Sequence, residues 1–285
     1  RFSQPSRTPP CKAFARDDIR DKVLTAYMGL IKQCDDQMGV LFDWLENTGR
    51  MDDTMIVITS DHGDFLGDHW LGEKTFFHDA SVKVPMIIYD PSEQANATRG
   101  TTSDALVECI DLAPTFVDVA GGDASALDHI LEGHSLLPLL RGGAAPARDY
   151  SICEYDYSAI PLAGRLGLHP DQSRMFMVAD HHWKMIHFES GHRPMLFDLQ
   201  ADPDELTDLG NSADHAETIA AMYDKLNAWA RRPAARTTLS NAAIMHKRTD
   251  PRRTGVLIGV ADASQATNDA AAKYIGRKAP DKRGR

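Results

Sequence analysis

The sequence predicts an α/β domain followed by a smaller α+β subdomain. Three observations indicate this class: helical periodicity at residues 16–44, a β-branched apolar run at residues 54–59, and three short apolar runs between residues 175 and 199. The chain has 285 residues, of which 42% are hydrophobic and 25% are charged, so it can bury a substantial core. This composition disfavours a disordered chain or a bare repeat array.

The first predicted element is one long helix over residues 16–44. Apolar residues recur there at three- and four-residue steps, which is the period of a helix that buries one face. The predicted buried face consists of Val23, Tyr27, Leu30, Ile31, Cys34, Met38, Leu41, Phe42 and Leu45. Gly49 follows at a position where helices commonly end in a left-handed residue.

Short apolar runs after this helix predict the strands of a covered sheet. Residues 54–59 form an unbroken run that is typical of a central strand with both faces buried. Residues 84–89, with Pro85 near their start, predict a second strand, and residues 105–110 a third. Residues 111–120 then predict a helix, with a proline tolerated in its first turn and two glycines as its stop.

The character of the chain changes after Gly142. Residues 175–179, 183–188 and 194–199 are separated by turn-like segments, which is the spacing of an antiparallel meander. Residues 213–232 carry apolar side chains at helical spacing. This part of the chain therefore predicts a small antiparallel sheet with one packed helix.

These changes divide the chain into three parts. Residues 1–142 belong to the α/β domain, residues 143–232 form the α+β subdomain, and residues 233–285 are a polar extension. The extension has a strand-like run at residues 256–260 and a basic end. We expect it to act as an arm through which the chain assembles into a homo-oligomer.

Charge and cysteine spacing exclude several classes of function. The formal net charge is −10, from 31 basic and 41 acidic residues, so the protein repels nucleic acids and anionic membrane surfaces. The four cysteines lack CxxC spacing, which argues against a structural zinc site and a disulfide-rich secreted fold. No signal peptide or transmembrane run is visible, so we expect a cytoplasmic protein with neither nucleic-acid nor membrane partners.

The strongest candidate site lies just after the predicted strand at residues 54–59. Asp61 and His62 can share one divalent cation, because aspartate supplies a hard oxygen ligand and neutral histidine a borderline nitrogen ligand. Gly63 lets the backbone turn away at once, and Lys74 is a compact positive charge suited to an anionic ligand near that cation. The alternative is structural: Asp61 caps the following turn, and His62 is a hydrogen-bonded histidine.

The same residues carry a resemblance to a known family. Several phrases occur together and in order: Thr59-Ser-Asp-His-Gly63, Leu66-Gly-Asp-His69, Lys74, Val84-Pro-Met-Ile-Ile88, Asp111-Leu-Ala-Pro-Thr115 and Leu196-Phe-Asp-Leu-Gln-Ala-Asp-Pro-Asp-Glu205. Over residues 17–232 the chain resembles the sulfatase family of the alkaline phosphatase superfamily. The resemblance implies part of an alkaline-phosphatase-like α/β/α sandwich, with a C-terminal subdomain of antiparallel sheet and helix.

The resemblance also implies an activity, namely hydrolysis of a sulfate ester or, in related branches, of a phosphonate or phosphate monoester or diester. By the match of motifs, Asp61 and His62 would be metal ligands, and Lys74 would contact both a formylglycine nucleophile and the ester oxygens. The Asp-His pair resembles the phosphonate monoester hydrolase, choline-sulfatase and iduronate-sulfatase-like branches. His62 favours Mn²⁺, Fe²⁺ or Zn²⁺ by ligand softness, whereas the family often uses Ca²⁺, so we expect Ca²⁺ or Mn²⁺ first.

One part of the family pattern is missing from this sequence. The nucleophile of the family lies in a Cys/Ser-x-Pro/Ala-x-Arg motif, but Cys11-Lys-Ala-Phe-Ala-Arg16 lacks the proline and places its arginine one position late. The first aspartate pair of the family's metal site is also missing. We therefore expect the chain to be the C-terminal portion of a longer enzyme that carries the formylglycine in its N-terminal part, and the isolated chain to be inactive.

Two further histidines and the exact function stay open. His69 and His78 are candidates for orienting His62 or contacting a small anionic ester substrate, beside a structural interpretation of each. The alternative function is a non-catalytic sulfatase-like module for binding or oligomerisation. A phosphomutase or nucleotide phosphodiesterase of the same superfamily would need a Thr or Ser nucleophile and usually a second metal, which nothing in the sequence demands.

Overall fold

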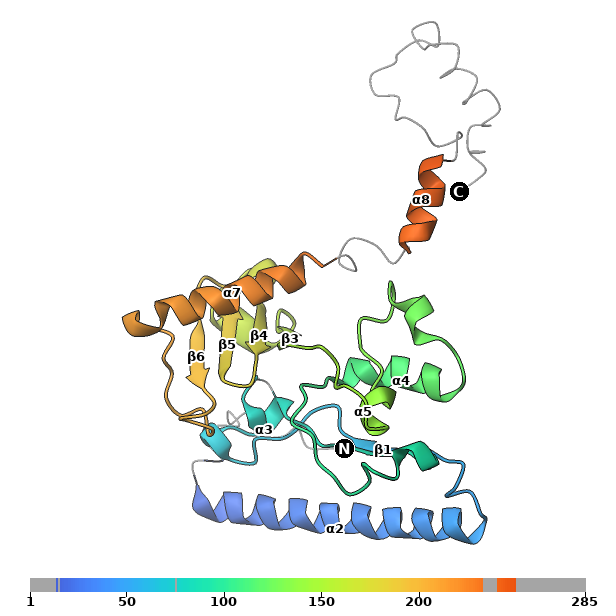
Figure 1. Ribbon diagram of the computed structural model, residues 1–285. Coiled ribbons are helices and arrows are strands. Elements are labelled where there is room, and N and C mark those ends of the chain that lie inside the picture. Colours follow the sequence, from blue (N-terminus) through green and yellow to red (C-terminus); the bar gives the residue numbers. More distant parts are fainter. Residues whose placement is uncertain (1–13, 15, 75, 233–239, 250–285) are drawn as a thin grey trace, which may run out of the picture. The chain divides into compact units, whose positions relative to one another are not determined.

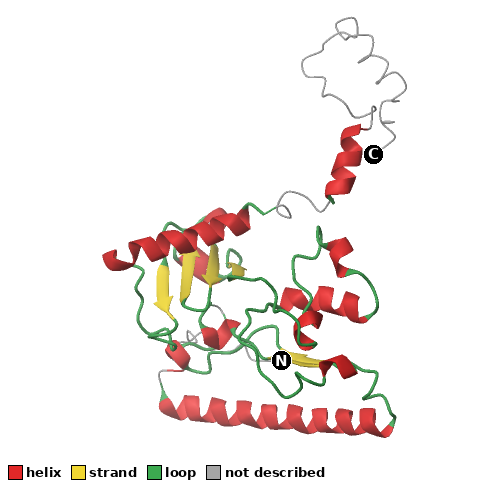
Figure 2. Cartoon of the chain, in the orientation of Figure 1, coloured by secondary structure: helices red, strands yellow, loops and turns green. Residues whose placement is uncertain are grey.

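The computed structural model describes residues 14, 16–74, 76–232 and 240–249 (Figure 1). The chain divides into two compact units, Arg1–Ala235 and Arg236–Arg285. The first unit combines helices with two separate sheets, which are drawn as yellow arrows in Figure 2. The candidate site lies in this first unit.

Helix α2 (Asp17–Asn47) confirms the long predicted helix, and Gly49 just beyond it has the left-handed φ of 68° that such a helix end favours. The prediction that this helix buries one face is wrong for the described residues. Its only buried residue is Leu45, whereas exposed large side chains include Leu24, Met28, Leu30, Ile31, Val40, Leu41 and Trp44. The physical reason is that a helix of this length spans about 45 Å, while the sheet beside the site offers only two described strands.

Strands β1 (Ile56–Thr59) and β2 (Met86–Tyr89) lie within the first two predicted strands and pair antiparallel. The prediction of a central strand with both faces buried is wrong for β1, because in the described structure it pairs with β2 alone and none of its residues is buried. Thr59 lies opposite Met86, so the segment between the strands leaves and returns at the same end of the ladder. The third predicted strand, at residues 105–110, is wrong. Residues 105–108 have no regular structure, and Cys109–Asp111 form the 3-10 turn η3. Neither sheet of the described residues includes this segment, so it has no ladder partner that would make it a strand.

The segment between β1 and β2 contains two short helices and most of the unusual backbone. The helices are η1 (Asp68–Trp70) and α3 (Asp79–Val82). Five described residues other than glycine have a positive φ, and four of them lie here: Leu66, His69, Trp70 and Glu73. Such conformations persist where the surrounding contacts fix them, and they cluster at functional sites.

Helix α4 (Leu112–Val119) confirms the predicted helix, with Pro114 in its first turn and Gly121 at a φ of 80° after its end. It belongs to a region of short elements between β2 and the second sheet. The other elements of that region are η2 (Glu93–Ala95), η4 (Ala124–Leu127) and α5 (Leu137–Leu140).

The fully buried carboxylate of Asp111 organises the start of α4. Both of its oxygens accept hydrogen bonds from the guanidinium of Arg148, with 2.7 Å between Nη2 and Oδ1. The backbone N–H groups of Glu108 and His134 donate to it as well, each at 2.8 Å. Burial raises the pKa of Asp111, but these hydrogen bonds and the Arg148 charge outweigh it and lower the pKa overall. The carboxyl therefore stays ionised although it is buried.

The second sheet is antiparallel, in the order β3-β4-β5-β6. Strands β4 (Arg174–Ala179), β5 (Trp183–Phe188) and β6 (Met195–Asp198) confirm the predicted meander. Strand β3 (Ser151–Asp156) is an addition that the sequence does not predict, because its serine, glutamate and aspartate break any apolar run. Between β3 and β4 the chain forms α6 (Pro161–Arg165) and η5 (Pro170–Gln172).

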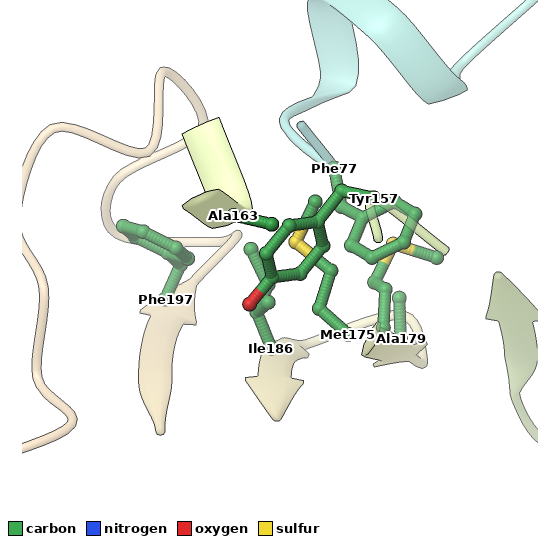
Figure 3. Packing of buried hydrophobic residues seen from close by; sticks show 8 residues of the cluster. Phe77, Tyr157, Ala163, Met175, Ala179, Ile186 and Phe197 are labelled. Carbon is green, nitrogen blue, oxygen red and sulfur yellow. The ribbon is translucent and has the colours of Figure 1, made fainter. Parts of the chain in front are cut away.

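Two hydrophobic cores cover the two faces of this sheet. Helix α7 (Ala216–Ala230), which follows η6 (Ala213–His215) and confirms the predicted C-terminal helix, packs Met222 and Leu226 on one face. The opposite face packs against Phe77, Tyr157 and Ala163 (Figure 3). Because Phe77 lies between β1 and β2, the second sheet contacts the segment that carries the predicted site.

The second unit is described through helix α8 (Asn241–Thr249). The predicted strand-like run at residues 256–260 and the basic end of the chain lie outside the described residues, as does Cys11. None of the helices in the described ranges has the length and apolar character needed to cross a bilayer.

Candidate active site

The candidate site begins at the end of strand β1. Ser60 Oγ donates to the carbonyl of His62 at 2.7 Å, and the backbone N–H of His62 donates to Asp61 Oδ1 at 3.1 Å, which closes a tight polar turn. The Asp61 side chain is 84% exposed and the His62 side chain 36%. Both side chains are therefore accessible to a ligand from solvent.

Two contacts fix the tautomer of the His62 imidazole. Nδ1 lies 2.7 Å from the carbonyl oxygen of Gly63, which can only accept, so Nδ1 carries the hydrogen. Nε2 lies against Nζ of Lys74, which can only donate, so Nε2 holds a lone pair. Asp61 Oδ2 is 3.5 Å from the same Nε2. The structure thus brings together all three residues of the predicted centre: a carboxylate, an imidazole lone pair and an amino group.

Helix α3 connects the two halves of the site. The N–H of Gly63 donates to the carbonyl of Ser81 at 2.7 Å, and Ser81 Oγ donates to the carbonyl of Lys74 at 3.1 Å. A Cβ atom at Gly63 would lie 2.1 Å from the carbonyl oxygen of Ala80, so only glycine fits at this close approach. The relative position of His62 and Lys74 therefore depends on α3.

A cavity of about 2180 Å³ opens in front of these residues. Asp61, His62 and Lys74 line it, together with side chains of β2 and of the second sheet, including Cys153 and Lys184. Pockets for small ligands usually measure about 300–1,000 Å³. The cavity therefore admits an ester substrate with much space left over.

The donor set fits part of a divalent metal site. Asp61 and His62 present an oxygen and a nitrogen lone pair close together, and the second nitrogen of His62 is anchored on a backbone carbonyl, as in most metal-bound histidines. Divalent cations in proteins take four or more ligands. Within the described ranges, no group of three or more His, Cys, Asp or Glu side chains is placed to hold a metal ion. Asp61 and His62 therefore offer two donors, fewer than a complete site needs.

The two further candidate histidines lie in an aromatic cluster. The rings of His69 and His78 stack with centroids 4.0 Å apart, and Phe65 and Phe197 meet His78 edge-on. Burial, the neighbouring His69 and the charge of Lys184 lower the pKa of His78 to about 4, so it is neutral near pH 7. In the described structure neither histidine is part of the cavity lining. The structure thus places them in an aromatic cluster and not on the cavity wall formed by Asp61, His62 and Lys74.

The structure also contains an ion cluster that the sequence motifs do not indicate, formed by Asp79, Lys184 and Glu205. Lys184 Nζ pairs with Asp79 and lies 2.7 Å from Glu205 Oε1. Lys184 is 1% exposed and Glu205 3%. Burial raises the pKa of Asp79, but the charge and hydrogen bond of Lys184 outweigh it and lower the pKa overall. A lysine that shares a strand face with Ile186 and Phe188 is the signal in the sequence that points to such a cluster.

Two protein families and several individual proteins are similar to this chain. Residues 2–122 match the Sulfatase family, and residues 67–232 match the family described as N-sulphoglucosamine sulphohydrolase, C-terminal. The multifunctional alkaline phosphatase superfamily protein PehA of Trinickia caryophylli is 32% identical over 230 residues, which cover 79% of this chain and 42% of PehA. An arylsulfatase of Clostridium perfringens is 31% identical over 194 residues, which cover 68% of this chain and 37% of the arylsulfatase.

Solved structures agree with these matches. The phosphonate monoester hydrolase of Agrobacterium radiobacter has a TM-score of 0.65 at 32% identity, and that of Silicibacter pomeroyi 0.70 at 29%. The likeness covers 75% and 76% of this chain but 41% and 42% of those two chains, and it confirms the predicted fold class. The C-terminal family alone matches more than half of this chain. The chain therefore belongs to the sulfatase family of the alkaline phosphatase superfamily.

Proposed function

We propose that this chain is the carboxyl-terminal part of a metal-dependent hydrolase that cleaves sulfate esters, or phosphonate or phosphate esters, of small molecules. The observation that carries the proposal is the meeting of Asp61, His62 and Lys74 at one point on the wall of a large cavity. Relatives named as arylsulfatase and as phosphonate monoester hydrolase support the two ester classes.

The chemistry of this group suits an anionic ester. Asp61 and His62 Nε2 would hold a divalent metal, and such a metal supplies Lewis-acid stabilisation of charge on the ester oxygens. With the Nε2 lone pair on a metal, Lys74 Nζ would be free of that contact, and its charge would be available to an oxygen of the substrate. The hydrogen bond from Nδ1 to Gly63 keeps the imidazole in the tautomer that this role needs.

The proposal places the nucleophile outside this sequence. The chain spans less than half the length of the relatives it matches, and Cys11 does not stand in the family's Cys-x-Pro-x-Arg pattern. The two donors of the described residues would be completed by ligands from the remaining part of the protein. The isolated chain should accordingly have no turnover, with a formylglycine and the remaining ligands supplied by the complete gene product.

Substitution of Asp61 and of Lys74 tests the site. In the complete gene product, Asp61→Ala and Lys74→Ala should each abolish metal-dependent turnover of an aryl sulfate and of a phosphonate monoester, while the thermal unfolding curve stays unchanged. Asp171→Ala and Lys32→Ala are the controls, because these exposed side chains lie outside the cavity lining and should keep full activity. Near-normal turnover in Asp61→Ala or Lys74→Ala would contradict the site assignment. Turnover by the isolated chain would contradict the proposal that its site is incomplete.

A second candidate function is a non-catalytic sulfatase-like module for binding or assembly. The observation that favours it is that the described residues provide two metal donors. The DNA upstream of the codon for Arg1 separates the two functions. An in-frame Cys-x-Pro-x-Arg series favours the hydrolase, and a start codon immediately before Arg1 favours the module.

A further inference from the structure

The ion cluster of Asp79, Lys184 and Glu205 joins three separate elements. Lys184 comes from β5, Asp79 is the first residue of α3, and Glu205 lies in the turns that follow β6. The amino group of Lys184 contacts both carboxylates, and the second oxygen of Glu205, Oε2, accepts the backbone N–H of Asp79 at 2.6 Å. Glu205 therefore holds the start of α3 through its backbone as well as through charge.

The backbone around Glu205 is also unusual. Glu205 has a φ of 54°, and it is the fifth described residue other than glycine in the left-handed region, while the other four lie in the segment next to Lys74. Left-handed backbone at such residues costs free energy and persists only where contacts fix it. The unusual backbone thus occurs in two places: beside Lys74 and at the residue that holds α3.

Helix α3 links the ion cluster to the candidate site through its contacts with Gly63 and Lys74. Two residues beyond Asp79, Ser81 accepts the N–H of Gly63 through its carbonyl and donates its hydroxyl to the carbonyl of Lys74. The contact between Gly63 and Ala80 leaves no space for α3 to move closer. A shift of α3 would therefore change the distance between His62 and Lys74.

A charged group in which Lys184 and Glu205 are buried and Asp79 is half-buried is a poor way to gain stability alone. Taking charges out of water costs free energy, and apolar side chains of the same volume often stabilise a protein equally well or better. The face of the sheet around Lys184 is otherwise apolar, with Ile186, Met177 and Phe197 nearby, so an apolar residue would pack there. This contrast favours a role in positioning.

We propose that Asp79, Lys184 and Glu205 are positioning residues, through which the C-terminal sheet sets the placement of His62 and Lys74. This rests on the proposed function, because it assigns those two residues to the working site. The ion cluster fixes α3, α3 fixes Gly63 and Lys74 through Ser81, and the imidazole of His62 then meets the amino group of Lys74.

Hydrogen exchange of single amides tests this in the full chain. In Asp79→Asn and Lys184→Met, we expect the amide of Gly63 to exchange roughly tenfold faster relative to the amides of β4, because its bond to Ser81 opens locally. A cluster that only stabilises the fold would raise the exchange of Gly63 and of β4 in the same proportion. That proportional result overturns the proposal.

Two matched controls separate position from charge. Lys225→Met removes an ion pair with Asp180 on the α7 side of the same sheet, and Lys83→Gln removes the exposed partner of Asp79, 3.3 Å away. Both variants should leave the ratio of Gly63 exchange to β4 exchange unchanged. Lys184→Arg, which keeps the charge, should restore most of the protection. An equal rise in Lys225→Met would overturn the proposal, because any lost ion pair of the sheet would then suffice.

A spectroscopic readout follows the site itself. The ¹⁵N signals of the His62 imidazole report whether Nε2 still lies against Lys74, and they should shift in Asp79→Asn and in Ser81→Ala. Ser81→Ala removes the hydrogen bond to Lys74 while all three charges remain, so it tests the link from α3 to the site even if the ion-cluster variants do not fold. Unchanged His62 signals in Ser81→Ala overturn the link from α3 to the site. These measurements use no substrate. A negative result here would disprove the positioning role even if the complete protein turns over its substrate, and a lack of turnover would disprove the proposed function without affecting these measurements.

Discussion

The neutral state of His78 makes the free energy of unfolding depend on pH. Burial, His69 and Lys184 lower its pKa from 6.5 to about 4, so between these values the unfolded chain binds a proton that the folded chain does not. Stability is therefore full above pH 6.5 and falls as the pH drops towards 4, by about 2 kcal/mol from pH 6.5 to about pH 5. Urea unfolding at these two pH values measures the loss.

Replacement of His78 by phenylalanine is the matching control. His78→Phe keeps a ring among Phe65, His69 and Phe197 but cannot bind a proton, so about 2 kcal/mol of the pH dependence should disappear. His181→Asn, at an exposed position, should keep the pH dependence of the parent chain. Equal pH dependence in His78→Phe and the parent would contradict the assignment.

Contacts within the candidate site can be predicted from the sequence where the contacting residues are close along the chain. Asp61 and His62 are adjacent, and Lys74 returns to them through one loop, so their types and spacing predict a common site that the structure assembles. The ion pair between Lys184 and Glu205 joins β5 to a later turn. No local pattern encodes that partner, because tertiary packing alone brings the two side chains together.

At the scale of elements, the pairing of Asp111 with Arg148 should dominate the stability of α4. Arg148→Met leaves the buried carboxylate without its cation and should reduce the free energy of unfolding by about 3–5 kcal/mol. Arg148→Lys should recover only part of the loss, because an amino group cannot donate in parallel to both oxygens. Denaturant unfolding of the purified variants gives both values.

A surface ion pair supplies the control for that prediction. Arg193 lies 2.7 Å from Asp208 and its side chain is half exposed, so Arg193→Met should cost less than about 1 kcal/mol. A loss for Arg148→Met as small as that for Arg193→Met would mean that Asp111 is satisfied by its backbone donors alone.

The sequence predicts elements with a strong apolar period and misses those without one. Helix α2, helix α7 and the meander β4 to β6 follow from their periodicity. Strand β3 pairs with β4 although its own residues are half polar, because the ladder and not its composition makes it a strand. The apolar residues 105–110 lack a ladder in the described structure and stay irregular.

At the scale of the whole molecule, the exposed face of α2 predicts different behaviour for the chain alone and for the complete protein. Ile31 and Leu41 are about half exposed, so Ile31→Lys and Leu41→Lys should change the free energy of unfolding of this chain by less than about 0.5 kcal/mol. Under the proposed function the same changes should destabilise the complete protein, where further chain would cover this face. Thermal unfolding of both forms compares the two.

The buried residue of the same helix is the internal reference. Leu45→Ala should destabilise both forms by about 2–5 kcal/mol, because Leu45 is buried within this chain itself. Identical effects of Ile31→Lys in the short and the complete forms would argue that nothing packs on α2.

The ladder between β1 and β2 has a consequence for how this site can diversify. Since Thr59 pairs with Met86, the two ends of residues 60–85 lie side by side at one end of the ladder. Replacement of this segment therefore leaves the strand order unchanged. Such a segment can be exchanged as a unit, and its contacts to Glu205, to the sheet behind Phe77 and to Arg20 of α2 restrict what can replace it. Chimeras that swap residues 60–85 between relatives should therefore fold when the residues at positions 184 and 205, which contact Asp79, are swapped with them.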